Sequence, residues 1–476
     1  MEHINYRVEK DSIGTKNVPS DQYYGVQSLR AAENFNITGL TIHPEMINSL
    51  AYIKKAAALT NFEVGLLPEN IADAIVQACD EIIGGKLHDA FITDPIQGGA
   101  GTSMNMNANE VIANRAIEIL GGQKGDYSIV HPNDHVNYGQ STNDVIPTAG
   151  KMTALHLLEE LKEELTRLHV AFTQKAKEFD HIIKMGRTQM QDAVPIRLGQ
   201  EFAAYAVATT RDIHRIEKAM GEIRSLNMGG TAIGTGINAD EQYLRRIVPN
   251  LCKVSHMDLT QAADLIDATQ NLDAFVSVSG SLKTCAVTLS KISNDLRLMS
   301  SGPRTGFGEI NLPAKQNGSS IMPGKINPVI PEVVSQVAFR VIGNDVTITM
   351  AAEAGQLELN AFEPVIFYSL FQSISILTQA IKTFIDNCVL GITANEERCR
   401  NLVENSIGII TAICPHVGYQ KAADIAKKAL KTGESVRTLI LEEKLLTEKE
   451  MECILDSFQM TSPGIPGKEL LDEPCA

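Results

Sequence analysis

The chain has 476 residues, of which 44% are hydrophobic and 21% are charged, and its formal net charge is −15. This length exceeds what one compact core usually holds, so two or three domains with the composition of a globular enzyme are expected. The negative charge balance disfavours nucleic acid or an anionic membrane as the main partner.

The N-terminus and the cysteines indicate a cytoplasmic protein. The opening stretch MEHINYRVEKDS lacks the apolar region of a signal peptide, and no later stretch approaches a charge-free membrane span. The 8 cysteines contain no C-x-x-C pair, so reduced thiols are expected. His131 and His135 have helical i, i+4 spacing, but Pro132 and Asn133 lie between them, which favours packing in a loop over a metal site.

The first half of the chain predicts a short N-terminal arm followed by helices. Residues 1–45 mix β-branched and turn residues, which indicates a hairpin or an extended arm, and a helical pattern runs from Pro44 to about Gly85. Residues 151–179 and 198–226 then predict two long amphipathic helices, with Glu163 and Arg167 forming an i, i+4 pair on the first. The apolar stripe of the first helix consists of Leu155, Leu158, Leu161, Leu165, Leu168 and Phe172.

The second half predicts more long helices and then shorter ones. The stretch 250–302 contains no proline, and a helix of about 40 residues there would reach roughly 60 Å. Runs at 332–358 and 365–390 follow, and helices become shorter after about residue 398. Five long helices with several apolar faces exceed what one subunit needs, so packing between subunits is expected. The expected domains are 1–142 at the N-terminus, 143–397 with the long helices, and 398–476 as a small helical domain.

Polar, glycine-bearing segments interrupt these helices at 97–110, 137–144, 185–201, 229–238 and 317–328. Taken singly, each is explained by helix capping; Ser141, Thr142 or Asn143 would cap the helix that follows. Taken together, they supply hydroxyls, amides, backbone N–H groups and the cations Arg187 and Lys325, which is the inventory that chemistry on a small dianion requires.

The segment GSSIMPGKIN at 318–327 is the most distinctive of these. Ile321 and Met322 argue against an ordinary solvated turn, because such a turn has no use for large apolar side chains. Its serines, methionine, proline, lysine and asparagine follow the order G-S-S-x-M-P-x-K-x-N, which resembles the signature of the fumarase/aspartase superfamily. Three further segments are similar to motifs of that superfamily, namely GAGTSMNMNANEVIANR (99–115), QSTND (140–144) and GRTQMQDAVPIRLGQE (186–201).

The resemblance runs from about residue 5 to residue 470. It implies a mainly α-helical subunit of three domains with a long central five-helix bundle. The bundles of four subunits would form a 20-helix core in a homotetramer of D2 symmetry, and each active site would draw residues from three chains.

The resemblance also implies the activity, a reversible anti elimination of ammonia from L-aspartate that gives fumarate through an enediolate (aci-carboxylate) intermediate. Ser319 would be the general base, activated by glycine-exposed N–H groups and by Lys325. The remaining site residues would bind substrate: Thr102, Ser141, Thr142, Asn143 and Ser320 at the β-carboxylate and amino group, and Thr188, Gln189, Lys325 and Asn327 at the carboxylates.

Position 189 favours an amine lyase over a hydratase. Many relatives have histidine there, which can protonate a departing hydroxide, whereas Gln189 cannot act as an acid. Ammonia leaves from an already protonated ammonium and needs no such help. Thr142, where fumarases typically show serine, points the same way. Glu332 matches the acid that partners the family histidine, so its role beside Gln189 stays open, with a hydrogen bond to the amide as one reading.

Two alternatives are retained. One is fumarate hydratase, and the other is a catalytically silent scaffold protein of the same fold, which the intact serine–lysine loop disfavours. The expected partners are small molecules (L-aspartate, fumarate and ammonia), with no nucleic acid and no membrane. No cofactor and no metal site are predicted, since no ligand cluster is apparent, and activation by divalent cations is left open.

Overall fold

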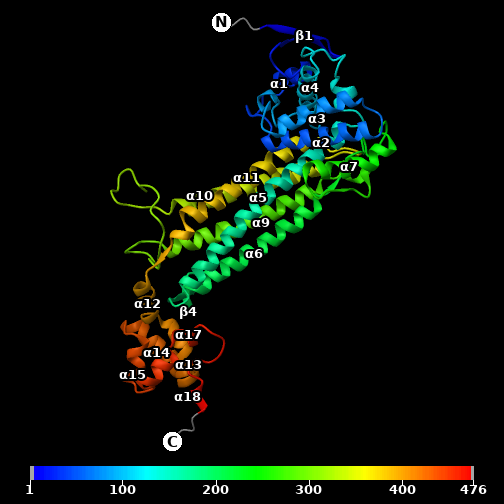
Figure 1. The fold of residues 1–476 in the computed structure, drawn as a ribbon. Helices are drawn as coiled ribbons and strands as arrows, with labels where there is room; N and C mark the ends of the chain where they lie inside the picture. Colours follow the sequence, from blue (N-terminus) through cyan, green and yellow to red (C-terminus); the bar gives the residue numbers. More distant parts are fainter. Residues whose placement is uncertain (1–4, 473–476) are drawn as a thin grey trace. The chain divides into compact units, whose positions relative to one another are not determined.

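The computed structural model describes residues 5–472, and the chain divides into two compact units. The first unit consists of Met1–Glu163, His214–Ala286 and Ala338–Thr378, and the second of Glu164–Ile213, Val287–Val337 and Gln379–Ala476. Figure 1 shows that helices dominate the chain, and the strands of the described residues pair only into small two-stranded sheets. The expected mainly α-helical fold is therefore confirmed.

The first unit opens with an antiparallel hairpin, as predicted, in which Tyr6 is paired with Pro19 and Lys10 with Thr15. Helix α2 packs against α3 and α7, and α3 packs against α4 (Figure 1). A short parallel pair joins β5 to β6. The elements of this unit are β1 Tyr6–Lys10, β2 Thr15–Pro19, α1 Val26–Asn34, α2 Pro44–Glu63, α3 Glu69–Ile83, α4 Thr102–Ile119, β5 Ser225–Leu226, α7 Glu241–Ser255, β6 Thr260–Gln261 and α8 Leu265–Gln270.

Five long helices contribute segments to both units. They are α5 Thr142–Glu178, α6 Leu198–Glu222, α9 Asp273–Met299, α10 Val329–Glu353 and α11 Glu363–Asn387. The predicted stripe on α5 is confirmed, because each of its six apolar residues is at most 4% exposed. The predicted pair Glu163–Arg167 is wrong. Arg167 instead contacts Glu164 at 2.5 Å and Asp386 at 2.8 Å, since i, i+3 spacing brings Glu164 closer.

The prediction of one helix of about 40 residues between 250 and 302 is also wrong. Helix α7 ends at Ser255, and α8 and α9 are separate helices. The side chain of Asp264 caps α8 by accepting hydrogen bonds from Ile266 N and Asp267 N, and Asn271 then adopts an extended backbone (φ −103°, ψ 134°). Short polar side chains bond to the backbone in this way and so favour helix ends, which a count of prolines does not reveal. Helix α9 has 27 residues.

Helix α11 and the 3-10 turn after it form an unusually apolar segment. The segment Glu363–Gly391 is long and apolar enough to cross a membrane by length and composition alone, but 67% of its most apolar window is buried inside the protein. Such burial is typical of a core helix. In the first unit, Phe367 on this helix stacks on Phe371 and meets Phe275 of α9 edge to face.

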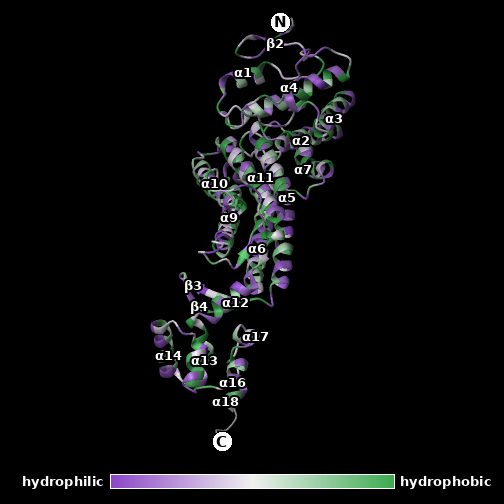
Figure 2. Cartoon of the chain, turned by 90° about the vertical axis from the view of Figure 1, so that its left-hand side faces the viewer, coloured by the Kyte–Doolittle hydropathy of each residue, from purple (hydrophilic) through white to green (hydrophobic). Residues whose placement is uncertain are grey.

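The second unit contains the hairpin β3–β4 and the antiparallel pair β7–β8. It also contains a group of short helices in the C-terminal part, as predicted. Met185 of β3 packs in one apolar cluster with Ile413, Leu439 and Met451. Figure 2 shows apolar and polar residues along both α13 and α14. The elements are β3 Ile183–Thr188, β4 Gln191–Arg197, β7 Ile310–Asn311, β8 Thr393–Ala394, α12 Glu396–Glu404, α13 Ile410–Val417, α14 Tyr419–Thr432, α15 Val436–Glu442, α16 Glu448–Ile454, α17 Ser457–Met460 and α18 Glu469–Asp472. The division into domains 1–142, 143–397 and 398–476 stays a prediction.

Candidate active site

The predicted site residues form two groups, one in each compact unit. The group in the first unit consists of Thr102, Ser141, Thr142 and Asn143. The group in the second unit consists of Thr188, Gln189, Ser319, Ser320, Lys325 and Asn327.

Thr102 is the first residue of α4 and is exposed. The preceding Gly101 has a left-handed backbone (φ 85°), and a Cβ atom there would lie 2.9 Å from Ile146 Cγ2. Only glycine satisfies both conditions without strain. The Thr102 hydroxyl donates to Gly99 O at 2.7 Å, so the turn 99–102 holds this hydroxyl at the helix N-terminus, where free backbone N–H groups attract anions.

Ser141, Thr142 and Asn143 lie at the N-terminus of α5, and all three are half-buried. Ser141 Oγ accepts a hydrogen bond from Asn143 N at 3.2 Å, so the predicted capping role is confirmed. Asn105 Nδ2 of α4 donates to Thr142 Oγ1 at 3.4 Å. The two helix N-termini that carry the first group are thus linked by a side-chain contact.

Asp144 follows this segment and is completely buried. Its Oδ1 accepts from Ser141 N at 2.9 Å, and its Oδ2 accepts from Gly229 N at 3.1 Å and Thr231 N at 3.0 Å. Burial raises the pKa of Asp144 to about 6, although these N–H donors act against the shift. One carboxylate therefore joins the segments 137–144 and 229–238, which the sequence analysis had identified separately.

Asn143 makes further contacts with the glycine-rich segment. Its Nδ2 donates to Ala232 O at 2.7 Å, and its own carbonyl oxygen accepts from Asn227 Nδ2 at 2.9 Å. One amide hydrogen of Asn143 is thereby engaged within the protein. Among the described residues, no hydrogen bond engages its second amide hydrogen or its Oδ1 atom, so these groups are left to meet a ligand.

In the second unit, Gln189 and Met190 form the two-residue turn of the β3–β4 hairpin, where Thr188 is paired with Gln191. Both turn residues have left-handed backbones, with φ of 53° and 64°. Hairpin turns of this kind favour asparagine and glycine, so these two side chains impose strain, as occurs at functional positions. Thr188 and Gln189 are exposed at the tip.

Arg187, which the sequence offered as a cation for the substrate, binds side chains of the protein instead. Its Nη1 donates to Glu309 Oε1 at 2.8 Å, and its guanidinium lies 4.0 Å from the centre of the Phe307 ring. Lys184 also contacts the fully buried Glu309, at 3.4 Å, and reaches Glu201 at 3.2 Å. Burial raises the pKa of Glu201, and Lys184 opposes this shift. This charged cluster at the base of the hairpin was missed by the sequence analysis.

Hydrogen bonds within the loop 317–328 fix its shape. Ser319 Oγ accepts from Met322 N at 3.0 Å and from Ile321 N at 3.3 Å. Gly318 N donates to Lys325 O at 3.0 Å, and Asn327 Nδ2 donates to Gly318 O at 2.7 Å. The half-buried Ser319 is therefore placed so that its oxygen faces two backbone donors.

The loop lies on the surface of the second unit, contrary to the expectation drawn from its apolar residues. Ile321 is 83% exposed and Met322 is 48% exposed, and Ser320 and Lys325 are exposed as well. Within residues 5–472, the Lys325 ammonium takes part in no ion pair. Apolar side chains exposed together in this way are typical of surfaces that another chain covers.

Glu332, whose role the sequence left open, lies 3.7 Å from Arg297, and both side chains are about 40% exposed. No hydrogen bond joins Glu332 to Gln189 in the described part of the chain. Glu332 therefore has a structural partner other than the amide.

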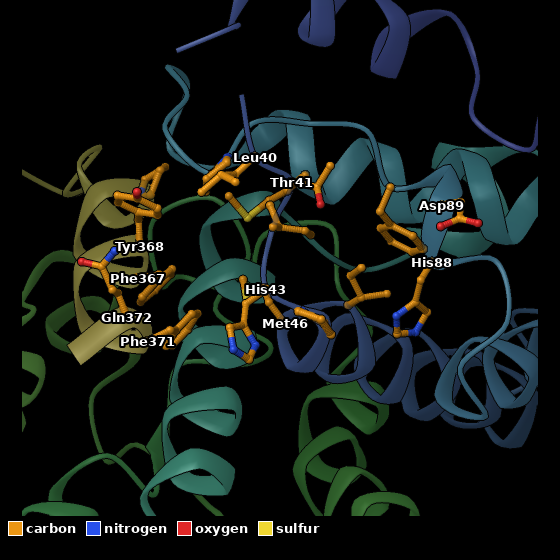
Figure 3. A pocket seen from close by; sticks show the side chains of 17 residues that line it. Leu40, Thr41, His43, Met46, His88, Asp89, Phe367, Tyr368, Phe371 and Gln372 are labelled. Atoms are coloured by element: carbon orange, nitrogen blue, oxygen red, sulfur yellow. The ribbon is translucent and has the colours of Figure 1, made fainter. Parts of the chain in front are cut away.

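In the part of the chain that the structure describes, neither a metal-binding cluster nor the apolar cavity of the first unit adds residues to the predicted site. No group of three or more potential ligands that could hold a metal ion occurs within residues 5–472. His131 and His135 lie in the first unit. Their contact is a hydrogen bond in which His135 Nδ1 accepts from His131 N at 2.9 Å. A cavity of about 580 Å³ in the first unit, bordered by His43, Met46 and Phe371, contains none of the predicted site residues (Figure 3).

Comparisons with known proteins agree with these motifs. A family model described as "Lyase" matches residues 14–343, and one described as "Fumarase C C-terminus" matches residues 409–462. The aspartate ammonia-lyase of Bacillus subtilis (strain 168) is 59% identical over 98% of this chain and 98% of its own length.

Two solved structures are also similar over most of the chain. The crystal structure of a fumarate lyase:delta crystallin from Brucella melitensis bound to cobalt is 51% identical with a TM-score of 0.94, covering 96% of this chain and 100% of that chain. That of a class II fumarase from Schistosoma mansoni is 36% identical with a TM-score of 0.92, over the same shares.

Proposed function

This chain belongs to the lyase family whose model spans residues 14–343, and we propose that it is an aspartate ammonia-lyase, which eliminates ammonia from L-aspartate to give fumarate. The observation that carries the proposal is the identity of 59% with an aspartate ammonia-lyase over almost the full length of both chains. The chain is accordingly a carbon–nitrogen lyase with a small-molecule substrate, and its resemblance to the fumarase/aspartase superfamily is confirmed.

Gln189 supports the amine lyase over the hydratase. An amide N–H is too weak an acid to protonate a leaving hydroxide, while the ammonium of aspartate departs as neutral ammonia without an acid. The exposed tip of the β3–β4 hairpin suits Gln189 to hydrogen-bonding a substrate carboxylate. Fumarate hydratase is the second candidate, favoured by the identity of 36% with the class II fumarase.

The reaction requires removal of a Cβ proton next to a carboxylate, which gives an enediolate with a second negative charge. Ser319 is the proposed base. The two backbone N–H groups that donate to its oxygen, at 3.0 Å and 3.3 Å, are placed to stabilise a serine alkoxide. The same kind of donor stabilises the negative charge that develops on the substrate.

The remaining residues bind the two ends of the substrate. Lys325 has no ion pair within the described residues and supplies the cation for the α-carboxylate. Thr188 and Asn327 add hydrogen bonds at that end. The β-carboxylate and the amino group are bound by Thr102, Ser141, Thr142, Asn143 and Ser320, with Gln189 as a further carboxylate contact.

The proposed assembly is a homotetramer whose central helices form a 20-helix core, with each site shared by three subunits. Helix α10 supports this assembly, because Phe339, Val346 and Met350 are 63%, 57% and 66% exposed and share one face at spacings of seven and four. The exposed side chains of Ile321 and Met322 would be buried if another subunit covered the 317–328 loop, which also supports the assembly.

The proposed location is the cytoplasm, where reduced thiols persist. All seven cysteines among residues 5–472 are free thiols. No cofactor is proposed.

The function is tested by following the ultraviolet absorbance of fumarate with L-aspartate and, separately, with L-malate. Fumarate is expected from L-aspartate alone. Its formation from L-malate instead would establish the hydratase, and its formation from neither would favour the silent scaffold.

A further inference from the structure

Lys54 is the fully buried lysine of helix α2, at 0% exposure. It lies in the same helix face as Leu50, Ile53 and Ala57, which are also buried. A lysine in such a position costs stability compared with an apolar residue of the same size, unless its donors are satisfied. Packing alone therefore does not account for a lysine here.

The hydrogen bonds of Lys54 lead to the segment that precedes the first group of site residues. Its Nζ donates to Asn137 Oδ1 at 2.8 Å and to Gln140 Oε1 at 2.9 Å. Gln140 is followed directly by Ser141 and Thr142. The lysine thus contacts both ends of the turn 137–140 that leads into α5.

The same turn is held from a second side by α4. Asn105 Nδ2 and Asn109 Nδ2 each donate to Asn137 Oδ1 at 3.2 Å, and Asn137 Nδ2 donates to Gln140 O at 3.1 Å. Lys54 and the two asparagines converge on one oxygen atom. Their effect is to fix the turn relative to α2 and α4, within the first unit.

Asp144 fixes the other side of the segment through Ser141 N and the glycine-rich residues 229–231. Asp144 is also the opposite charge that acts most strongly on the buried lysine. Along the chain, the three site residues 141–143 are therefore flanked by Gln140, which accepts from the buried lysine, and by the buried carboxylate of Asp144.

We propose that Lys54 is a positioning residue for the lyase reaction: through Asn137 and Gln140 it holds Ser141, Thr142 and Asn143 in the geometry that binds the amino group and β-carboxylate of the substrate. The inference rests on the proposed function. In this proposal Lys54 acts through Asn137 and Gln140 and not on the substrate, and Ser319 should keep its position when Lys54 is changed, since its hydrogen bonds lie within its own loop.

The test compares Lys54→Met with Lys151→Met, with fumarate formation measured on the folded tetramer. Lys151 is a buried lysine of the same unit, 6% exposed, whose Nζ donates to Ser225 O at 2.6 Å rather than to residues 137–144. Methionine is similar in volume to lysine, so each variant removes one buried amine with little change in packing. We expect Lys54→Met to lose about 10- to 100-fold in kcat/KM, mainly through KM, as for the loss of strong hydrogen bonds that orient a binding group. Lys151→Met should lose less than about threefold.

Melting temperatures of both variants separate positioning from general destabilisation. Equal losses of kcat/KM in the two variants, or a loss in Lys54→Met that leaves KM unchanged, would overturn the inference. If Lys54→Met yields no folded tetramer, Gln140→Met decides, because it removes one acceptor and leaves the lysine in the core. An unchanged KM in Gln140→Met would overturn the inference as well. Failure of the wild-type chain to convert L-aspartate would instead count against the proposed function.

Discussion

The side chain of Asn327 donates a hydrogen bond of 2.7 Å to the carbonyl oxygen of Gly318, nine residues earlier in the chain. The two residues lie at the ends of the loop that carries Ser319, Ser320 and Lys325. A Cβ atom on residue 318 would lie 2.6 Å from Asn327 N, a backbone atom that can move away only if the chain itself shifts. The close approach of these two residues therefore sets the shape of the loop.

Gly318→Ala should lower kcat/KM by about 100-fold, because displacing a catalytic group by as little as 1 Å has an effect of that size. The melting temperature should stay close to that of the wild type, since the loop is exposed. Gly221→Ala is the matched control: a Cβ at that helical position meets nothing within 4 Å. Its activity should be unchanged. Wild-type activity in Gly318→Ala would show that the loop shape does not matter for catalysis.

Lys325→Met should raise KM for L-aspartate and also lower kcat. The lysine is proposed to bind the α-carboxylate through a charge-assisted contact, and its charge also supports the alkoxide of Ser319. Steady-state kinetics of fumarate formation measures both constants. Lys315→Met is a suitable control, since Lys315 is an exposed lysine shortly before the same loop. Kinetics like those of the wild type would mean that Lys325 does not face the substrate.

Local patterns were sufficient to predict much of this fold. The stripe of α5 and the cap at Ser141 depend on residues a few positions apart, and both are found in the structure. Helix α8 starts at the cap Asp264 and ends at the extended Asn271, and the effect of these short polar residues on the backbone, which competes with helix propensity, was not recognised.

Contacts between distant residues account for what the sequence could not predict. Arg187 was expected to serve the site, but its partner Glu309 lies 122 positions away in the chain. Lys54 was overlooked because a lysine in a helical pattern usually marks the solvated face, and its acceptors are 83 and 86 positions away. Its place between Ile53 and Ala57, on the apolar side of the helix, could have indicated that this lysine is buried.

The stability of the first unit should depend on pH through Asp144. Burial raises its pKa from 3.8 to about 6, so the folded chain binds this proton more tightly than the unfolded chain does. The stability that Asp144 contributes, relative to Asp144→Asn, should therefore be greatest below pH 3.8 and should decrease as pH rises from about 4 to about 6. Urea unfolding of both proteins across this range gives the difference. An increase of that difference with pH would contradict the assignment.

The exposed apolar face of α10 should mediate assembly. Met350 is 66% exposed on the face that carries Phe339 and Val346, and a carboxylate there would be buried without a partner in the proposed core. Met350→Glu should therefore dissociate the proposed tetramer and abolish activity, as measured by analytical ultracentrifugation and fumarate formation. Leu430→Glu, a change at a residue that is 71% exposed on α14, should leave the assembly intact. A stable, active monomer of the wild-type chain would refute both the tetramer and the shared site.

Ser319 and Ser320 are adjacent, and they should differ in how their loss affects turnover. If Ser319 removes the Cβ proton, Ser319→Ala loses most of kcat, while the affinity for a substrate analogue such as succinate changes by a few fold at most. Ser320 is exposed and is proposed only to donate a hydrogen bond to the β-carboxylate. Removing one such donor typically costs about 100- to 1000-fold in kcat at most.

Ser319 is proposed as a base that no other group replaces, whereas Ser320 is one of several hydrogen-bond donors to the substrate. Both variants must be measured on folded protein in the same assembly state as the wild type, because both serines belong to a loop whose shape depends on Gly318 and Asn327. Ser319→Ala should be the more damaging change by at least about tenfold, which is more than about 1.4 kcal/mol of transition-state stabilisation. If Ser320→Ala proves the more damaging, or Ser319→Ala keeps near-normal turnover, the proton is taken by another group, and the two N–H donors at Ser319 serve only the fold of the loop.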